Sequence, residues 1–148
     1  MKNIYGREIV SLQETEIVLP SFLGIKPSGV SLAFIKHDND LYYSVYLLTK
    51  IKTILDDLMQ KKQNASNSKQ MDEIVSQINS LFACIKYKTT TKNGRRIVLP
   101  HDCILNAKNN NNQLLIEGRD DYFALYDDLK QYDSYHKSLP DSRTLFRG

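Results

Sequence analysis

The chain has 148 residues, which suits one medium-sized domain or two small ones that share a core. Its two cysteines, Cys84 and Cys103, are too few for a disulfide framework and lack the paired spacing of a zinc site, so both are expected to pack in a reducing compartment. Residues 1–6 lack the apolar core of a signal peptide, and no stretch approaches the roughly 20 apolar residues that span a bilayer. The sequence therefore predicts a soluble, cytoplasmic protein that does not enter a membrane.

The formal net charge is +3, but the charges are unevenly placed along the chain. No acidic residue lies between Glu73 and Asp102, and that window contains Lys86, Lys88, Lys92, Arg95 and Arg96. A basic window of this kind either binds phosphate groups or forms an ordinary solvated face. Charge alone leaves both interpretations open.

An internal repeat organises the chain. Ile17–Pro20 and Ile97–Pro100 are the same tetrapeptide, Ile-Val-Leu-Pro, at an offset of 97 − 17 = 80. Tyr42–Tyr46 and Tyr122–Tyr126 are similar aromatic segments at the same offset. Between these anchors each half carries one apolar run followed by a polar turn. The sequence therefore predicts two homologous halves.

Each half is expected to contain strands and tight turns, because its apolar segments are short, β-branched or aromatic, and bounded by Pro, Gly, Asn and Asp. Proline cannot donate to a sheet ladder, so Pro20 and Pro100 each mark the end of a strand. The predicted order is strand, short helix, strand, turn, strand. In the first half these segments are 17–19, 21–23, 30–35, 37–40 and 42–46, and in the second they are 97–99, 101–107, 113–116, 118–121 and 122–126.

A helical hairpin is predicted between the halves. Apolar side chains recur every three or four residues from Val45 to Lys62 and again from Ile74 to Phe82, with the polar loop Gln63–Ser68 between them. This apolar stripe exceeds what two small half-units need to cover, which favours an oligomer over a monomer.

The predicted domains are residues 1–46 and 84–126 for the two repeats, 47–83 for the helical connector, and 127–148 for a C-terminal helix and tail. The asparagine run Asn109–Asn112 is expected to form an exposed turn, since asparagine tolerates left-handed backbone.

The second half resembles the second repeat of the MraZ family, bacterial regulators built from two AbrB-type (SpoVT-AbrB) swapped-hairpin units. The resemblance rests on a turn at Gly94–Arg95 before the strand that ends at Pro100, on Gly118 after the next strand, and on the aromatic segment that closes the last one. It implies an α+β fold, a double-repeat AbrB/MraZ-like swapped-hairpin β-barrel with an inserted helical hairpin.

The resemblance also implies a function. A MraZ-like protein is expected to bind short direct repeats of double-stranded DNA upstream of a cell-division and cell-wall gene cluster, as a ring-like homo-oligomer on the nucleoid. The family carries an aspartate, three residues, then an arginine in each repeat. In the second half Thr91 or Lys92 stands in place of the aspartate, and Arg95 or Arg96 can fill the arginine position. Glu16 stands where the first half would carry its arginine.

The residues themselves predict the same surface. A sharp turn at Asn93–Gly94 between segments 85–89 and 97–99 would form a two-stranded ribbon with a basic tip, which fits a major groove. Arginine reads guanine through two hydrogen bonds and lysine binds phosphate, whereas Asn93 either binds adenine or only serves the turn. The predicted DNA-binding residues are Arg95, Arg96, Lys92, Asn93, Lys88 and Lys86.

No convergent nucleophile, base or set of metal ligands stands out in the sequence, so neither catalysis nor a metal or cofactor is expected. His37, His101 and His136 are scattered and lack partners at ligand spacing. The rival interpretation is a protein-interaction scaffold on the same fold that has lost DNA recognition, which Glu16 favours. An antitoxin-like role is a third option, because that class uses the same swapped hairpin.

Overall fold

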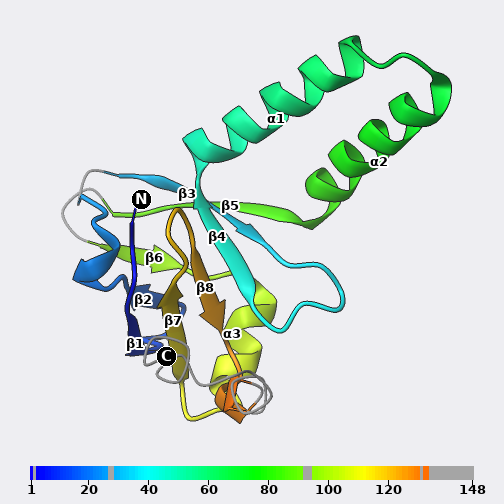
Figure 1. The fold of residues 1–148 in the computed structure, drawn as a ribbon. Coiled ribbons are helices and arrows are strands. Elements are labelled where there is room, and N and C mark those ends of the chain that lie inside the picture. The colour runs from blue at the N-terminus through cyan, green and yellow to red at the C-terminus, as the bar shows by residue number, and fades with distance from the viewer. Residues whose placement is uncertain (2, 27–28, 92–94, 131, 134–148) are drawn as a thin grey trace, which may run out of the picture.

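The computed structural model describes residues 1, 3–26, 29–91, 95–130 and 132–133 (Figure 1). The first half contains four strands and a 3-10 turn: β1 (Arg7–Ser11), β2 (Glu16–Val18), η1 (Ser21–Leu23), β3 (Ser31–Ile35) and β4 (Tyr43–Leu47). The second half repeats this order with a longer helix: β5 (Ile85–Thr89), β6 (Arg96–Val98), α3 (His101–Lys108), β7 (Gln113–Gly118) and β8 (Phe123–Tyr126). Helices α1 (Leu48–Gln63) and α2 (Ser68–Cys84) connect the halves. The mixed α+β class predicted from the sequence is confirmed.

The strands of the two halves are interleaved. A six-stranded antiparallel sheet has the order β1-β7-β8-β4-β3-β5, and β2 pairs with β6 in a separate two-stranded ribbon. The first strand of each half therefore pairs with the third strand of the other half, β1 with β7 and β5 with β3. The second strands pair with each other, and so do the fourth strands, β4 with β8. Neither half has a complete sheet of its own.

The register places an approximate two-fold axis between equivalent residues. Ile17 lies opposite Ile97 in the ribbon, and Ser44 lies opposite Ala124 in the sheet. Both pairs are separated by 80 residues, since 97 − 17 and 124 − 44 give the same number. The repeat found in the sequence is thus a repeat in space at these two places.

The offset of 80 does not hold along the whole of each half. Leu12 donates its N–H to the carbonyl of Asn112 at 2.7 Å, and Thr90 donates to the carbonyl of Val30 at 2.9 Å. These two hydrogen bonds occupy equivalent places in the two halves. Leu12 therefore corresponds to Thr90, an offset of 90 − 12 = 78, and Val30 corresponds to Asn112, an offset of 112 − 30 = 82. The offset rises from 78 in the first strands to 80 in the ribbon. The turn between β5 and β6 is therefore two residues longer than the turn between β1 and β2.

The predicted closed barrel is wrong for the described part of the chain. The six-stranded sheet ends in β1 on one side and β5 on the other, and the ribbon stays separate from both. A physical reason is the proline after each ribbon strand. Pro20 and Pro100 follow the three-residue strands β2 and β6 after one further residue and provide no N–H, so the ribbon ends before it can extend a ladder to the sheet.

Strand β1 was not predicted from the sequence. Its five residues include only one buried side chain, Val10, so the alternation that identifies a half-buried strand is missing. Pairing with β7 defines β1 instead. The other predicted strands and the two short helical segments are confirmed within one to three residues at their ends.

The main core lies between the sheet and the ribbon. It combines ribbon residues such as Ile17 and Ile97 with Leu32 and Phe34 of β3 and Leu114 of β7. Gly118 is the last residue of β7 and lies where the N-terminal segment crosses this strand. A Cβ atom at this position would lie 2.7 Å from the carbonyl oxygen of Ile4. A side chain at this position would displace the backbone of residue 4.

The helical hairpin projects away from the sheet and ribbon (Figure 1). Helix α1 begins at Leu48 and not at Val45, because Val45 belongs to β4 and is buried between β3 and β8. Asn67 caps α2 by accepting a hydrogen bond from the N–H of Gln70 at 2.9 Å. Ile51 of α1 is the one buried residue in the two helices, and it packs against Ala33 and Ile35 of β3.

Two further expectations concern turns and termini. Asn111 and Asn112 both have a φ of 59°, so the asparagine run forms a turn with left-handed backbone, as predicted. Residues 129–130 and 132–133 are helical, and the remainder of the predicted C-terminal helix and tail lies outside the described residues. Of the helices that the structure describes, none is sufficiently long and apolar to cross a membrane.

Candidate nucleic-acid interface

The ribbon of β2 and β6 presents one buried and one open face. Ile17 and Ile97 are each only 1% exposed and point into the core. The residues on either side of them, by the alternation of a strand, point away from it. This open face carries two valines and two opposite charges: Val18, Val98, Glu16 and Arg96.

The two ends of the ribbon carry the turns of the two halves. In the first turn Gln13 and Glu16 exchange backbone hydrogen bonds of 2.8 and 3.0 Å, which leaves a two-residue loop with Glu14 at a φ of 59°. The second turn is wider, because the N–H of Thr91 donates to the carbonyl of Arg96 at 3.0 Å and four residues lie between them. Lys92 and Asn93, which were predicted to contact DNA, lie outside the described residues, as does the Asn93–Gly94 turn.

Arg95 and Arg96 lie together at the end of the ribbon. The carbonyl of Arg95 accepts a hydrogen bond from the N–H of Leu19 at 2.8 Å, which holds the second turn against the end of β2. Arg96 is exposed and lies opposite Val18. Among the described residues the ion pairs are Lys50 with Asp121 and Arg119 with Glu117, so neither guanidinium is paired with a described carboxylate.

Lys86 and Lys88 lie further back, on the edge strand β5. Lys86 lies opposite Phe34 and Lys88 lies opposite Leu32, so both lysines are on the face of the sheet that is directed toward the core. Because β5 is at the edge of the sheet, Lys86 is exposed and Lys88 is half-buried. At about 3.3 Å per residue, Lys88 is roughly 10 Å and Lys86 roughly 17 Å along the strand from Thr91. The described basic residues of this window therefore lie in two places, the lysines on β5 and the arginines at the end of the ribbon.

Acidic residues from the first half lie beside this tip, which the sequence window did not reveal. A groove of about 350 Å³ between β1 and the end of β2 is lined by Glu8, Val18 and Ser21 together with Arg95. Glu16 shares the open ribbon face with Arg96 on the diagonal. The fold thus places two carboxylates near the two arginines, although both are about 80 residues away in the chain.

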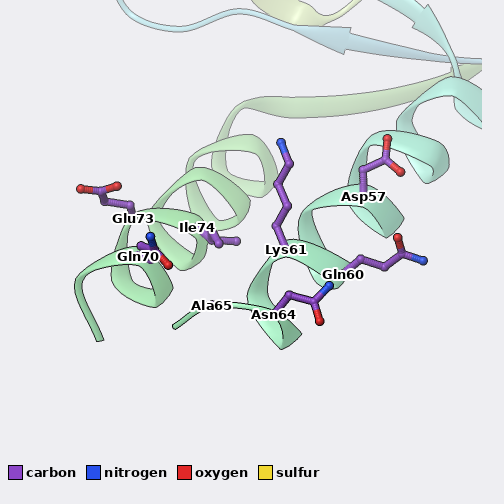
Figure 2. Close-up of a pocket in the computed structure, with 8 residues that line it drawn as sticks. All are labelled: Asp57, Gln60, Lys61, Asn64, Ala65, Gln70, Glu73 and Ile74. Atoms are coloured by element: carbon purple, nitrogen blue, oxygen red, sulfur yellow. The ribbon is translucent and has the colours of Figure 1, made fainter. Parts of the chain in front are cut away.

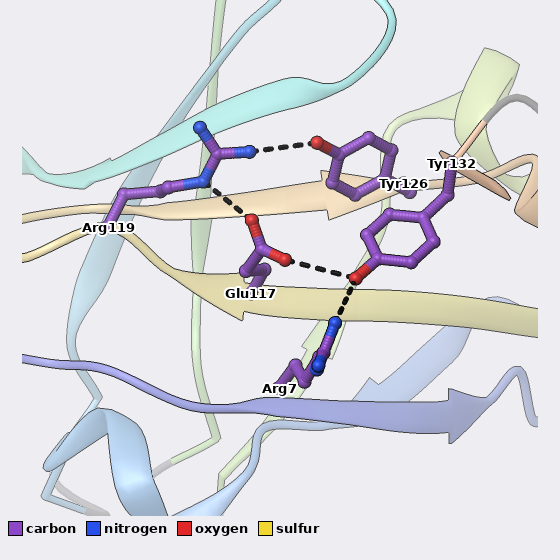
Figure 3. Close-up of polar contacts among 5 residues, drawn as sticks. All are labelled: Arg7, Glu117, Arg119, Tyr126 and Tyr132. Carbon is purple, nitrogen blue, oxygen red and sulfur yellow. Dashed lines mark hydrogen bonds and ion pairs between the residues drawn. The ribbon is translucent and has the colours of Figure 1, made fainter. Parts of the chain in front are cut away.

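A second polar cluster joins the C-terminal segment to the sheet (Figure 3). The hydroxyl of Tyr132 accepts from Arg7 at 2.8 Å and donates to Glu117 at 3.1 Å. Arg119 donates to Glu117 and to the hydroxyl of Tyr126, both at 2.8 Å. Burial raises the pKa of Tyr132, and the hydrogen bond from Arg7 opposes that rise. The charged groups of this cluster bind one another. The cluster therefore stabilises the packing of the C-terminal segment against β1 and β7.

The buried thiol and carboxylate do not form a reactive site. Burial raises the pKa of the Cys103 thiol, which keeps it protonated and inert, and confirms the predicted packing role. Asp127 is buried and accepts a hydrogen bond from the Asn106 amide at 3.0 Å, while burial raises its pKa. Cys84 is half-buried in the cluster between the sheet and the hairpin.

The two histidines that the structure describes lie in different segments of the chain. His37 lies in a turn, where its N–H donates to Asp40, and His101 is exposed at the start of α3. His136 lies outside the described residues. Within the described ranges, no three side chains of His, Cys, Asp or Glu gather in a way that could hold a metal ion.

An open groove of about 550 Å³ lies between α1 and α2 near their connecting loop (Figure 2). It is lined by polar and charged side chains, among them Asp57, Lys61, Gln70 and Glu73, and also by Ile74 and Ala65. These groups come from two surface helices and make no site for a reaction. The ribbon tip is therefore the candidate functional surface.

Comparison of the chain with models of protein families finds no match, and comparison with curated proteins finds no similar sequence.

Proposed function

We propose that the protein is a MraZ-like transcriptional regulator that binds double-stranded DNA through the basic tip of its second repeat and acts as a homo-oligomer. The observation that carries the proposal is the position of Arg95 and Arg96 at the end of the ribbon, where no described carboxylate pairs with either of them. Unpaired arginines at the end of a narrow two-stranded element are suited to DNA, since such an element fits the major groove.

The exchange of strands between the halves supports the family part of the proposal. AbrB-type units interleave hairpins from two copies, and here β1 pairs with the second half while β5 pairs with the first. The proposed fold is therefore of the swapped-hairpin type, with both copies supplied by one chain.

The proposed contacts divide by chemistry. Arg95 or Arg96 would donate two hydrogen bonds to a guanine edge, whereas Lys86, Lys88 and Lys92 would neutralise phosphates along the duplex. The second turn is also two residues longer than the first, as the hydrogen bond from Thr91 to Arg96 shows.

The first repeat is the weaker half for DNA. Its turn is short and carries Glu14, and Glu16 points outward from the ribbon. Carboxylates at these positions repel phosphate. The chain would therefore present one competent tip, and an oligomer would restore affinity by presenting several at once.

The proposal is tested by titrating fluorescent duplex DNA with the full chain at several salt concentrations. Wild type is expected to lose affinity steeply with salt, and the Arg95→Ala, Arg96→Ala double variant is expected to bind about tenfold or more weakly with a shallower slope. Lys69→Ala, an exposed lysine on α2, is the matched control. Equal binding by the arginine variant and the control would refute the proposed surface.

A second candidate is a protein-interaction scaffold that has lost DNA recognition. The observation in its favour is the proximity of Glu8 and Glu16 to the arginines, which lowers the positive potential of the tip. The same titration separates the two functions, because a scaffold would show no salt-dependent binding to duplex DNA.

A further inference from the structure

The two halves meet at equivalent places, but the residues at those places differ. Arg7 of β1 lies opposite Glu117 of β7. At the equivalent place Ile85 of β5 lies opposite Ile35 of β3. The offsets of the first and third strands relate these two pairs, since 85 − 7 = 78 and 117 − 35 = 82. One contact between the halves is therefore charged, and its counterpart is apolar.

The charged pair is bridged by a third side chain (Figure 3). The hydroxyl of Tyr132 accepts a hydrogen bond from Arg7 at 2.8 Å and donates one to Glu117 at 3.1 Å. Arg7 belongs to the first half, Glu117 belongs to the second half, and Tyr132 lies in the segment that follows the second half. This contact therefore needs residues from both parts of the chain.

The apolar pair lies under the helical hairpin. Ile35 is 7% exposed, and both isoleucines belong to the cluster that contains Ile51 of α1. An arginine or glutamate at this place would lose water without gaining a partner of opposite charge, which is unfavourable. The residues of the charged pair are therefore poor substitutes for those of the apolar pair.

A difference in size accompanies the difference in charge. Tyr87 of β5 lies opposite Ala33, which is fully buried. Its counterpart in β1 is Ile9, which lies opposite Leu115. Side chains directly opposite each other in an antiparallel pair are in contact. A large residue is thus beside a small one in one contact, whereas two residues of medium size meet in the other.

The ribbon adds opposite charges at equivalent positions. Glu16 and Arg96 are counterparts, since 96 − 16 = 80, and they lie on a diagonal of the open ribbon face. Two first halves that paired with each other would place two copies of Glu16 on this diagonal. Two second halves would likewise place two copies of Arg96 there. Like charges at neighbouring positions of two strands destabilise their pairing.

We propose that these contacts make each half pair with the other half and not with a second copy of itself, and that Arg7 and Glu117 contribute most to this preference. Pairing of two first halves would place Arg7 opposite Ile35, and pairing of two second halves would place Glu117 opposite Ile85. Specificity is the difference in free energy between two pairings, and both pairings of like halves leave a charge opposite an isoleucine.

The preference has a consequence for the whole chain. If like halves paired, two chains could exchange partners and form one unit with two first turns and another with two second turns. Pairing of unlike halves instead provides one turn of each kind, the short turn that contains Glu14 and the wider turn that ends at Arg96. This inference goes beyond the proposed function, because it concerns the assembly of the halves and is tested without DNA.

The experiment detects the pairing of like halves through a disulfide. Ser44 lies opposite Ala124 at the two-fold axis, so two paired first halves would bring Ser44 of one chain opposite Ser44 of the other. Full chains with Ser44→Cys, with and without Arg7→Ile, are unfolded under reducing conditions, refolded at micromolar concentration and oxidised. Non-reducing gels measure the joined chains, and mass spectrometry identifies the disulfide between the two substituted positions.

Arg7→Ile is expected to raise the yield of this disulfide about tenfold or more, because isoleucine matches Ile35 of another first half and no longer matches Glu117. Ser11→Ile is the matched control, since it adds the same side chain to the same face of β1 without changing the charged pair. The control should keep the yield of Ser44→Cys alone. Equal yields in the Arg7→Ile chain and in the control, or a high yield with Arg7 in place, would overturn the proposal.

A second variant covers the case in which Arg7→Ile fails to fold. Glu16→Gln together with Arg96→Gln removes charges from the open ribbon face, where neither side chain is buried, so the fold should be retained. The yield of the disulfide is expected to rise about two- to threefold, because like charges no longer oppose the pairing of like halves. A yield equal to that of Ser44→Cys alone would contradict the proposal.

Discussion

Ile17 and Ile97 lie directly opposite each other in the two-stranded ribbon, and each is the same residue of its repeat. Both side chains are almost completely buried, so the approximate two-fold axis of the molecule passes through the core at this pair. The two halves therefore meet through identical side chains, and the stability of each half depends on the other.

The first prediction follows from this pair. Ile17→Ala and Ile97→Ala are each expected to lower the free energy of unfolding by about 2–5 kcal/mol, because each leaves a cavity in the shared core. The two losses should be similar, since the sites are equivalent. Urea denaturation measures both, with Val18→Ala on the open face as the control. A large loss at one site and almost none at the other would argue against the common axis.

The second prediction concerns the turn of the first repeat. Glu14 has a φ of 59° in a two-residue hairpin loop, where glycine is favoured. Glu14→Gly is expected to stabilise the protein by about 0.5–1 kcal/mol by removing this strain. Thermal unfolding measures the effect, and Thr15→Gly, at a position without positive φ, should not stabilise the protein.

The third prediction concerns the crossing of the N-terminal segment over β7. A Cβ atom at Gly118 would lie 2.7 Å from the carbonyl oxygen of Ile4 and 2.9 Å from its carbon. Gly118→Ala is expected to cost about 1–3 kcal/mol, because backbone atoms must move apart. The expected sign of disruption is faster amide exchange at Ile4 and Asp120, which exchange two backbone hydrogen bonds of 3.0 Å. Exchange rates equal to those of wild type would show that the segment adapts freely.

The fourth prediction restores charge to the first repeat. Glu16→Arg is expected to raise DNA affinity and steepen its salt dependence, because it removes a carboxylate from the open ribbon face beside Arg96 and adds a phosphate contact. Glu73→Arg, the same change on α2, is the control for net charge. If both variants gain affinity equally, the ribbon face has no special role.

The fifth prediction concerns the pH dependence of stability. Burial raises the folded-state pKa of Asp127 above its ordinary value of 3.8. The folded state therefore binds this proton more tightly than the unfolded state, and the resulting contribution to the free energy of unfolding is fully present below pH 3.8 and is lost as the pH rises through the folded-state pKa. Asp127→Asn is expected to remove this loss and to increase stability at pH 7 relative to pH 4. Denaturation at both pH values, with the exposed Asp72→Asn as control, measures the difference. If the variant keeps the pH dependence of wild type, the loss of stability between pH 4 and pH 7 does not come from Asp127.

The sequence by itself determined the repeat, most of its strands and the helical hairpin. The repeated Ile-Val-Leu-Pro segment predicted equivalent strands, and those are β2 and β6. The three- and four-residue spacing of apolar side chains predicted both helices, because that spacing reflects the geometry of a single helix. These features depend on residues close together in the chain, and local pattern is sufficient for them.

The tertiary structure alone decided how the halves combine. Strand β1 has little alternation of its own and exists through its pairing with β7, more than 100 residues away. The same exchange of strands brings Glu8 and Glu16 beside Arg95 and Arg96, so a window without acids in the sequence has acidic neighbours in space. Register between distant strands depends on the whole core and not on any one segment, which is why the surroundings of the candidate site could not be predicted from the order of its residues.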